Sequence, residues 1–147
     1  MGFGLPAAIG AKIACPEQEV WLIVGDGGFQ MSQSELQTIV QEGIKINIAI
    51  INNGYLGMVR QWQEFFYEGN YQGTPLSSPD FVKIADAHGL VGKRVTARKE
   101  VAQAVEWARN QAGTALIEFV VEAEESVYPM VPAGAALHQM IRRPNNH

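Results

Sequence analysis

Three short, strongly apolar segments separated by helical patterns constrain the fold of this chain more than any other feature. They cover residues 19–24 (EVWLIV), 46–51 (INIAII) and 115–121 (ALIEFVV). Near-continuous apolar runs of this length are typical of strands that are buried on both faces. Strands that alternate with helices form a mostly parallel sheet joined by right-handed crossovers. We therefore predict an α/β fold with three layers (α/β/α), in which helices cover both faces of the sheet.

The segments around these runs have the signatures of helices. Ser32 and Glu35 have the S-x-x-E spacing of a capping box, which predicts the start of a helix. Gly43 is expected to end that helix, and Ser78 is expected to cap a later one. The expected helices are 5–14, 32–42, 55–67, 80–88 and 100–112, with a further short strand at 91–95.

Length and composition fit one compact domain and exclude several classes of protein. The chain has 147 residues, of which 47% are hydrophobic, so a sizeable core is available. The formal net charge is -4 and the 11 Lys and Arg residues are scattered, which argues against a nucleic-acid surface or a basic membrane patch. No apolar run approaches the roughly 20 residues of a membrane-spanning helix. The single cysteine excludes an internal disulfide.

The start of the chain is an apolar, glycine-rich segment, MGFGLPAAIGAKIAC, with no polar lead-in. Chain ends are usually exposed and polar. We therefore expect Met1 to be an internal residue of a longer protein, which makes this an N-terminally truncated domain. Residues 1–121 are expected to form the α/β domain, and residues 122–147, with three prolines, an irregular tail.

Two polar residues follow two successive predicted strands at the point where each strand ends. Asp26 lies between glycines in the stretch VGDGGF, and Asn53 follows the strand at 46–51. In an open parallel sheet, ligands bind beyond the carboxyl ends of the strands, so Asp26 and Asn53 should meet there if their strands are neighbours. A carboxylate, an amide oxygen and a backbone carbonyl suit octahedral Mg²⁺, which also takes phosphate oxygens. Gly25 and Gly27 would let backbone N–H groups approach a phosphate; the alternative is that Asp26 and Asn53 are ordinary turn formers.

These residues carry a resemblance to a known family. GDGGF followed by INNGYLGM closely resembles the G-D-G…N-N signature of thiamine-diphosphate-dependent enzymes. The stretches LGMVRQWQEFFYEGNY and SVYPMVPAGAAL are similar to the catalytic subunit of acetolactate synthase (acetohydroxyacid synthase). MGFGLPAAIGAKIA resembles the segment that leads into the cofactor domain of the superfamily. The resemblance covers nearly the whole chain and implies the thiamine-diphosphate-binding fold, as the C-terminal domain of that subunit.

The resemblance also implies roles for individual residues. Asp26 and Asn53 would give side-chain oxygens to Mg²⁺ and Tyr55 its backbone carbonyl, so that the metal bridges the two phosphates of thiamine diphosphate. Met58 and Trp62 would line the channel to the reacting carbon. The residues implied to contact the cofactor are Met1, Gly25, Asp26, Gly27, Gly28, Asn53, Tyr55, Gly57 and Met58.

Several functions implied by the resemblance lie outside this chain. The family decarboxylates pyruvate and joins the product to a second 2-ketoacid, a transferase step in branched-chain amino-acid biosynthesis. The glutamate that activates the cofactor comes from the pyrimidine-binding domain of a partner subunit, so no catalytic residue is expected here and the isolated chain is expected to be inactive. Most FAD contacts of the family also lie in another domain. The resemblance further implies a cytoplasmic homo-oligomer (a homodimer or larger), a regulatory small subunit, and a tail, residues 122–147, that covers the site.

Two alternatives remain open on the sequence. One keeps the cofactor and changes the reaction, as in a pyruvate or indolepyruvate decarboxylase or a glyoxylate carboligase; the stretches QWQ and VYPMVP argue against it. The other is a non-catalytic α/β module that binds a nucleotide or another protein, which would explain the missing glutamate without truncation. The spacing of Asp26 and Asn53 argues against this second alternative.

Overall fold

The computed structural model describes residues 1–144 and contains one four-stranded sheet in which all neighbouring strands are parallel. The strand order is β1-β2-β4-β3. The strands are β1 (Trp21–Gly25), β2 (Asn47–Asn52), β3 (Val91–Val95) and β4 (Ala115–Val120). The predicted strands and the parallel sheet are therefore confirmed, and β1 and β2 are neighbours, as a shared site at their ends requires.

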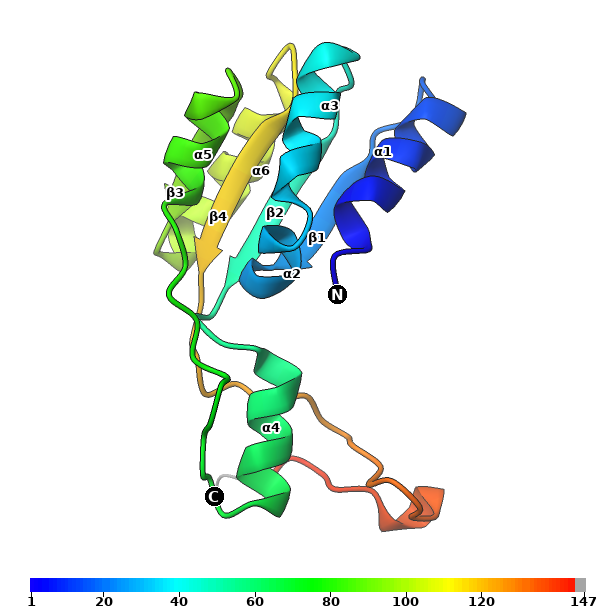
Figure 1. Cartoon of the computed structure of the whole chain (residues 1–147), viewed down its shortest axis with the longest axis vertical. Helices are drawn as coiled ribbons and strands as arrows, with labels where there is room; N and C mark the ends of the chain where they lie inside the picture. Colours follow the sequence, from blue (N-terminus) through cyan, green and yellow to red (C-terminus); the bar gives the residue numbers. More distant parts are fainter. Residues whose placement is uncertain (145–147) are drawn as a thin grey trace.

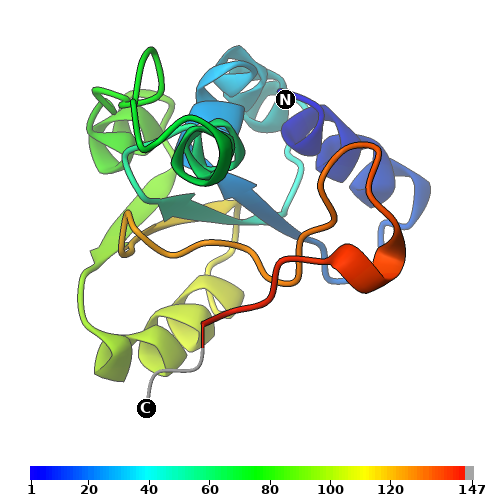
Figure 2. The ribbon, with the colours of Figure 1, turned by 90° about the horizontal axis from the view of Figure 1, so that it is seen from below.

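Helices lie on both faces of this sheet, which confirms the three-layer arrangement. In Figures 1 and 2, α6 lies on one face, and α1, α2, α3 and α5 lie on the other. Helix α4 projects beyond the carboxyl ends of the strands, together with the tail (Figure 1). None of the helices within residues 1–144 has the length and apolar character needed to cross a bilayer. The helices are α1 (Gly4–Ala14), α2 (Asp26–Gln30), α3 (Leu36–Gln41), α4 (Gly57–Phe66), α5 (Phe81–Ala87) and α6 (Val101–Arg109), with 3-10 turns at Gln33–Glu35, Arg98–Glu100 and Leu137–Gln139.

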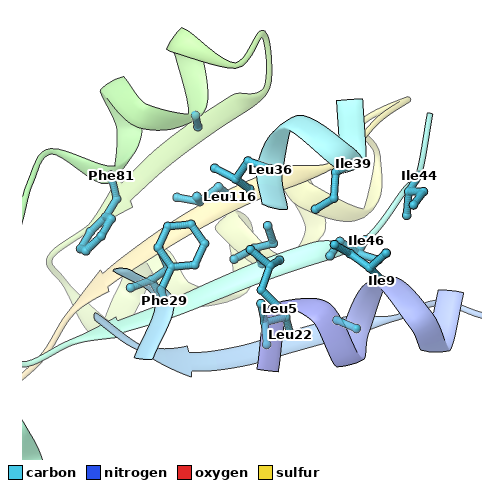
Figure 3. Close-up of a cluster of buried hydrophobic side chains, with 14 residues drawn as sticks. Leu5, Ile9, Leu22, Phe29, Leu36, Ile39, Ile44, Ile46, Phe81 and Leu116 are labelled. Carbon is cyan, nitrogen blue, oxygen red and sulfur yellow. The ribbon is translucent and has the colours of Figure 1, made fainter. Parts of the chain in front are cut away.

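The larger part of the core lies between the sheet and the helices α1, α2, α3 and α5. Phe29 of α2 and Phe81 of α5 are fully buried and meet edge to face, with ring centroids 5.6 Å apart. Figure 3 shows these rings beside the aliphatic side chains of the central strands. This packing fixes α2, and with it the residues just after β1, against the sheet. The buried aliphatic members of the cluster include Leu5, Ile9, Leu22, Leu36, Ile39, Ile46, Ile48, Ile50 and Leu116.

The opposite face is covered over only part of its width. Helix α6 packs on β3 and β4 through a smaller cluster that includes Ala104, Ala108 and Ile117. Strand β1 forms one edge of the sheet. Its Leu22 is buried on the face covered by α1, whereas Ile23 points to the opposite face and is 74% exposed. The described chain therefore leaves apolar surface open at the β1 edge.

The prediction of a capping box at Ser32 and Glu35 is wrong. The Ser32 side chain makes no capping hydrogen bond, and residues 33–35 form a 3-10 turn that leads into α3. Residues 26–30, between the first strand and the predicted helix at 32–42, form the short helix α2. The Glu35 side chain accepts a hydrogen bond from the Thr38 hydroxyl at 3.2 Å. The predicted end of α3 before Gly43 is confirmed, and Gly43 has the expected positive φ of 60°.

The prediction that Ser78 caps α5 is also wrong. The N-cap of α5 is Asp80, whose carboxylate accepts hydrogen bonds from the backbone N–H groups of Val82 and Lys83 at 3.2 and 3.3 Å. An aspartate two residues downstream supplies the cap. Ser78 is thereby free to make a different contact, with Asp26.

The described part of the tail beyond β4 is largely irregular, and it is tied to α4. The side-chain amide of Gln61 donates to the carbonyl oxygen of Val127 at 2.9 Å and accepts from its N–H at 2.7 Å. Phe65 and Tyr128 pack with ring centroids 5.5 Å apart. Within the tail, Met130 and Ile141 form an antiparallel β-bridge. The last three residues of the predicted tail, 145–147, lie outside the described part of the chain.

Candidate functional site

A pocket of about 370 Å³ lies at the carboxyl ends of β1 and β2. All nine residues for which the sequence predicted contact with a cofactor lie on its wall. They come from the start of the chain, from the end of β1 and the start of α2, and from the segment that joins β2 to α4 together with the first turn of α4. The residues that line the pocket are Met1, Gly25, Asp26, Gly27, Gly28, Ile51, Asn53, Tyr55, Leu56, Gly57, Met58 and Val59.

The register of the sheet explains why Asp26 and Asn53 meet. Gly25, the last residue of β1, pairs with Ile51 near the end of β2. Asp26 is therefore the first residue beyond one strand, and Asn53 the first beyond its neighbour. Parallel strands that end together place the residues that follow them at the same edge of the sheet.

Asp26 is a buried carboxylate without a basic partner. Its side chain is 1% exposed and accepts a hydrogen bond from the Ser78 hydroxyl at 2.9 Å. Within residues 1–144, no lysine, arginine or histidine forms an ion pair with it. A buried charge is costly unless an opposite charge compensates it. A carboxylate in this setting fits a cation held in the pocket.

The segment that follows β2 presents further oxygen atoms to the same pocket. The side-chain oxygen of Asn53 accepts a hydrogen bond from the N–H of Tyr55 at 3.2 Å, which leaves a second lone pair on that oxygen. Gly54 allows the sharp turn with a φ of 68°. Two backbone hydrogen bonds of 2.8 Å, Leu56 N–H to Thr74 and Leu76 N–H to Gly54, fix the segment against the loop before α5.

The oxygen donors are of mixed chemical type. No group of three or more His, Cys, Asp and Glu side chains suited to a metal occurs among the residues that the structure describes. A metal in this pocket would therefore have to combine the Asp26 carboxylate with amide and carbonyl oxygens, and Mg²⁺ accepts such a set together with phosphate oxygens and water.

Gly27 forms a part of the wall in which a side chain has no space. A Cβ at this position would lie 2.9 Å from Leu56 Cδ2, 2.9 Å from Leu76 Cδ1 and 3.5 Å from Met1 Cε. At Gly57, a Cβ would lie 3.1 Å from the Asn53 side-chain nitrogen. The space that these side chains would need is already filled by Leu56, Leu76 and Asn53, so glycine at both positions lets the segments of the pocket wall pack closely together.

The two residues predicted to line a substrate channel differ in their positions. Met58 is 51% exposed and lies on the pocket wall. Trp62, one turn further along α4, packs against Phe66 with ring centroids 5.2 Å apart and is not part of the lining. The structure therefore brings Met58 to the pocket and places Trp62 next to it along the exposed face of α4.

Sequence reasoning missed three residues that support this site. Ser78 holds Asp26, while the buried Glu118 of β4 accepts a hydrogen bond from the Asn52 side chain at 2.7 Å. Asn52 in turn accepts from the N–H of Gly54 at 3.1 Å. The one available signal was a single charged residue in the otherwise apolar run ALIEFVV. Such a residue in a buried strand needs a partner, but the sequence does not say which one.

Comparison with known proteins identifies the class to which this site belongs. Residues 1–119 match the family described as "Thiamine pyrophosphate enzyme, C-terminal TPP binding domain". The chain belongs to this family. The fold is shared with the thiamine diphosphate-dependent 4-hydroxybenzoylformate decarboxylase of Rhodococcus jostii RHA1, with a TM-score of 0.79 and 32% sequence identity over 86% of this chain and 24% of that one.

Within this class, the chain is similar to acetolactate synthases. It is 51% identical to the acetolactate synthase of Mycobacterium leprae over 142 residues, which are 92% of this chain and 23% of the relative. It is 48% identical to the mitochondrial acetolactate synthase of Schizosaccharomyces pombe over 141 residues, which are 96% of this chain and 21% of that protein. The chain thus spans about a quarter of the length of the relatives that it matches. The resemblance noted from the motifs is confirmed.

Proposed function

We propose that this chain binds the diphosphate end of thiamine diphosphate through Mg²⁺ in the pocket beyond β1 and β2. Asp26 and Asn53 supply side-chain oxygens and Tyr55 its backbone carbonyl. The observation that supports this most directly is the burial of the Asp26 carboxylate without a basic partner among the described residues. A divalent cation supplies the missing positive charge, and the phosphates complete its coordination.

The remaining pocket residues surround the cofactor. Gly25, Gly27 and Gly28 expose backbone to the diphosphate, because none of them places a side chain over it. The cofactor's ring system would lie against Met1, Gly57 and Met58, which line the same pocket. When bound, the cofactor supplies the electron sink for decarboxylation of a 2-ketoacid. The part of this chain is to bind and orient it.

We further propose that the whole protein is an acetolactate synthase, which joins pyruvate to a second 2-ketoacid. Identities of 45–51% to acetolactate synthases over more than nine tenths of the chain support this activity. The 32% identity to a decarboxylase of the same class is lower. Substrate would approach past Met58 and Trp62, and the tail from residue 122 onward would cover the site from the side of α4.

The other parts of the proposed enzyme lie outside the described site. The pyrimidine-binding domain of a partner subunit supplies the glutamate that activates the cofactor, so the functional unit is a homo-oligomer in the cytoplasm. FAD binds mostly to another domain, and a regulatory small subunit modulates activity. Within this chain, no residue is assigned a catalytic role.

Calorimetry tests the binding proposal. Thiamine diphosphate is titrated into the chain with Mg²⁺ and then with EDTA, and the titration is repeated on Asp26→Ala and on Asp86→Ala, which removes an exposed aspartate of α5 as a matched control. We expect Mg²⁺-dependent binding by the wild type and the control, and none by Asp26→Ala. Equal binding by all three variants, or no Mg²⁺-dependent binding by the wild type, would contradict the proposal.

The reaction is tested separately on the full protein that contains this chain. Incubation with pyruvate, Mg²⁺, thiamine diphosphate and FAD should yield acetolactate. Acetaldehyde as the main product would identify a decarboxylase and reject the proposed activity while leaving the cofactor site intact.

A further inference from the structure

Glu118 is a buried acidic residue at the centre of the sheet. It lies on β4, is 3% exposed, and follows Ile117, which packs toward α6 on the opposite face. Its two carboxylate oxygens have different partners: one accepts from the Asn52 side-chain amide at 2.7 Å and the other from Nε of Arg94 at 2.6 Å. Both contacts lead toward the pocket described above.

The first contact leads to the oxygens that follow β2. Asn52 accepts a hydrogen bond from the N–H of Gly54 at 3.1 Å, so its side chain closes the turn that contains Asn53. The next turn bond runs from the N–H of Tyr55 to the Asn53 side chain at 3.2 Å. The rotamer of Asn52 is set by Glu118, because the amide donates to the carboxylate while its oxygen accepts from the turn. Glu118 thereby constrains the segment from which Asn53 and Tyr55 present their oxygens.

The second contact leads to Asp26. Arg94 of β3 bridges Glu118 to Asp80, with its NH2 group 3.0 Å from the Asp80 carboxylate. Asp80 caps α5 and lies two residues after Ser78, which donates to Asp26 at 2.9 Å. The hydrogen bond from Arg94 to Glu118 raises the pKa of the guanidinium, with Asp80 contributing further.

We propose that Glu118 is a positioning residue for the metal site, which holds the Asn53–Tyr55 turn through Asn52 and the Ser78–Asp26 contact through Arg94 and Asp80. The inference rests on the proposed Mg²⁺ and thiamine diphosphate site and adds a residue that does not touch either ligand. Groups that orient the ligands of a metal typically contribute 10- to 100-fold to its affinity. We expect an effect of this size from Glu118.

A purely structural role for Glu118 predicts a different outcome. Removal of one partner from a buried pair leaves the other partner without compensation. Arg94 is 42% exposed, so it stays solvated when the carboxylate is removed, but the Asn52 side-chain amide loses its acceptor. Glu118→Leu should therefore lower the thermal midpoint without metal and also weaken Mg²⁺ binding. With a purely structural role for Glu118, Mg²⁺ affinity would fall only as far as in a control variant with a similar loss of stability.

The test is calorimetric titration of Mg²⁺ into the chain in the presence of a fixed excess of thiamine diphosphate, with thermal unfolding measured in EDTA. The variants are Glu118→Leu, the conservative Glu118→Gln, and Asn52→Ala, which removes the same link to the turn if Glu118→Leu does not fold. The matched control is Glu19→Leu, which breaks an ion pair with Arg109 (2.8 Å) at the opposite end of the sheet. A second control, Ile117→Val, lowers stability at the adjacent position on the other face.

We expect Glu118→Leu and Asn52→Ala to weaken Mg²⁺ binding about 10-fold or more. Glu118→Gln should recover part of the affinity, because its amide oxygen still accepts from Asn52. The two controls should bind as the wild type does. Affinity losses in Glu118→Leu no larger than those in Ile117→Val would overturn the inference.

The same titrations separate this inference from the proposed function. If Asp26→Ala abolishes Mg²⁺ binding and Glu118→Leu binds like the wild type, the metal site stands and the role of Glu118 is rejected. If the wild type shows no Mg²⁺ binding with thiamine diphosphate, both are rejected.

Discussion

The wild type and the variant Asp26→Asn should exchange their order of stability when Mg²⁺ and thiamine diphosphate are added. In the metal-free protein, the Asp26 carboxylate is 1% exposed, and the Ser78 hydroxyl is its side-chain partner. Asparagine keeps an oxygen that accepts this hydrogen bond and removes the uncompensated charge. The variant should therefore be the more stable of the two in EDTA, and the less stable when Mg²⁺ and thiamine diphosphate are present.

The size of both effects follows from the environment of the carboxylate. Loss of a partner from a buried ion pair costs about 3–5 kcal/mol because a charge is left uncompensated. A hydrogen bond to a charged group returns about 1.5–3 kcal/mol of this. We therefore expect Asp26→Asn to raise the free energy of unfolding by about 2 kcal/mol without metal, near the middle of the range of about 0–3.5 kcal/mol that these two values allow. A ligand at 100 times its dissociation constant stabilises the wild type by about 2.7 kcal/mol, which exceeds that gain.

Thermal unfolding followed by circular dichroism measures both quantities. One kcal/mol corresponds to about 2–4 °C for a domain near this size, so the ligand should raise the wild-type midpoint by about 5–11 °C and leave that of the variant unchanged. Asp86→Asn, which neutralises an exposed aspartate, should respond to the ligand as the wild type does. A variant that is less stable than the wild type in EDTA, or that gains the same increment from the ligand, would refute the reasoning.

Three further predictions concern the core, the tail and the response to acid. Phe29→Ala, which removes a fully buried ring packed edge to face on Phe81, should lower the free energy of unfolding in urea by about 3–5 kcal/mol. Gln61→Ala, which removes both hydrogen bonds to Val127, should speed limited proteolysis within the tail and leave the midpoint of the sheet domain unchanged; unchanged cleavage would show that the tail is held by other contacts. A hydrogen bond from the backbone of α5, with the nearby cations as smaller causes, lowers the pKa of Asp80 below its ordinary value of 3.8. The stability that the Asp80 carboxylate contributes is therefore present above pH 3.8 and is lost as the pH falls through the lowered pKa. Asp80→Asn keeps the cap but does not titrate. In urea unfolding, this variant should lose less stability than the wild type below about pH 4.

The sheet and the meeting of Asp26 with Asn53 could be predicted because they depend on local patterns and on one general rule. Runs such as INIAII are too apolar and too short for anything but buried strands, and parallel strands joined by helices end at a common edge. Once β1 and β2 are neighbours, the residues that follow them must converge. The glycines at 25, 27 and 28 follow the same rule, since they are contiguous with Asp26.

The supporting contacts could not be predicted, because they join segments that are distant in the sequence. Ser78 lies in the segment before α5 and Asp26 begins α2, so the contact that occupies the Ser78 hydroxyl, and leaves Asp80 as the cap of α5, cannot be read from the sequence around Ser78. Glu118 is recognisable as unusual in its strand, but its partners come from β2 and β3. The capping box at Ser32 does not form because residues 33–35 make a 3-10 turn and α3 begins only at Leu36.

The parallel topology also determines the order in which the site can assemble. Asp26, Asn53 and Tyr55 belong to the single unit β1–α2–α3–β2 and the turn that follows it, so these oxygens come together through contacts that are close in sequence. The pairing of β2 with β4 joins Asn47 to Ala115 and must wait until α4, α5, β3 and α6 have been accommodated, and closing such a long loop is slow. During synthesis the proposed metal ligands therefore emerge well before Ser78 and Glu118. We expect a nascent chain that ends before Ser78 to be insensitive to Mg²⁺, because the contacts of Ser78 with Asp26 and of Glu118 with Asn52 have not yet formed.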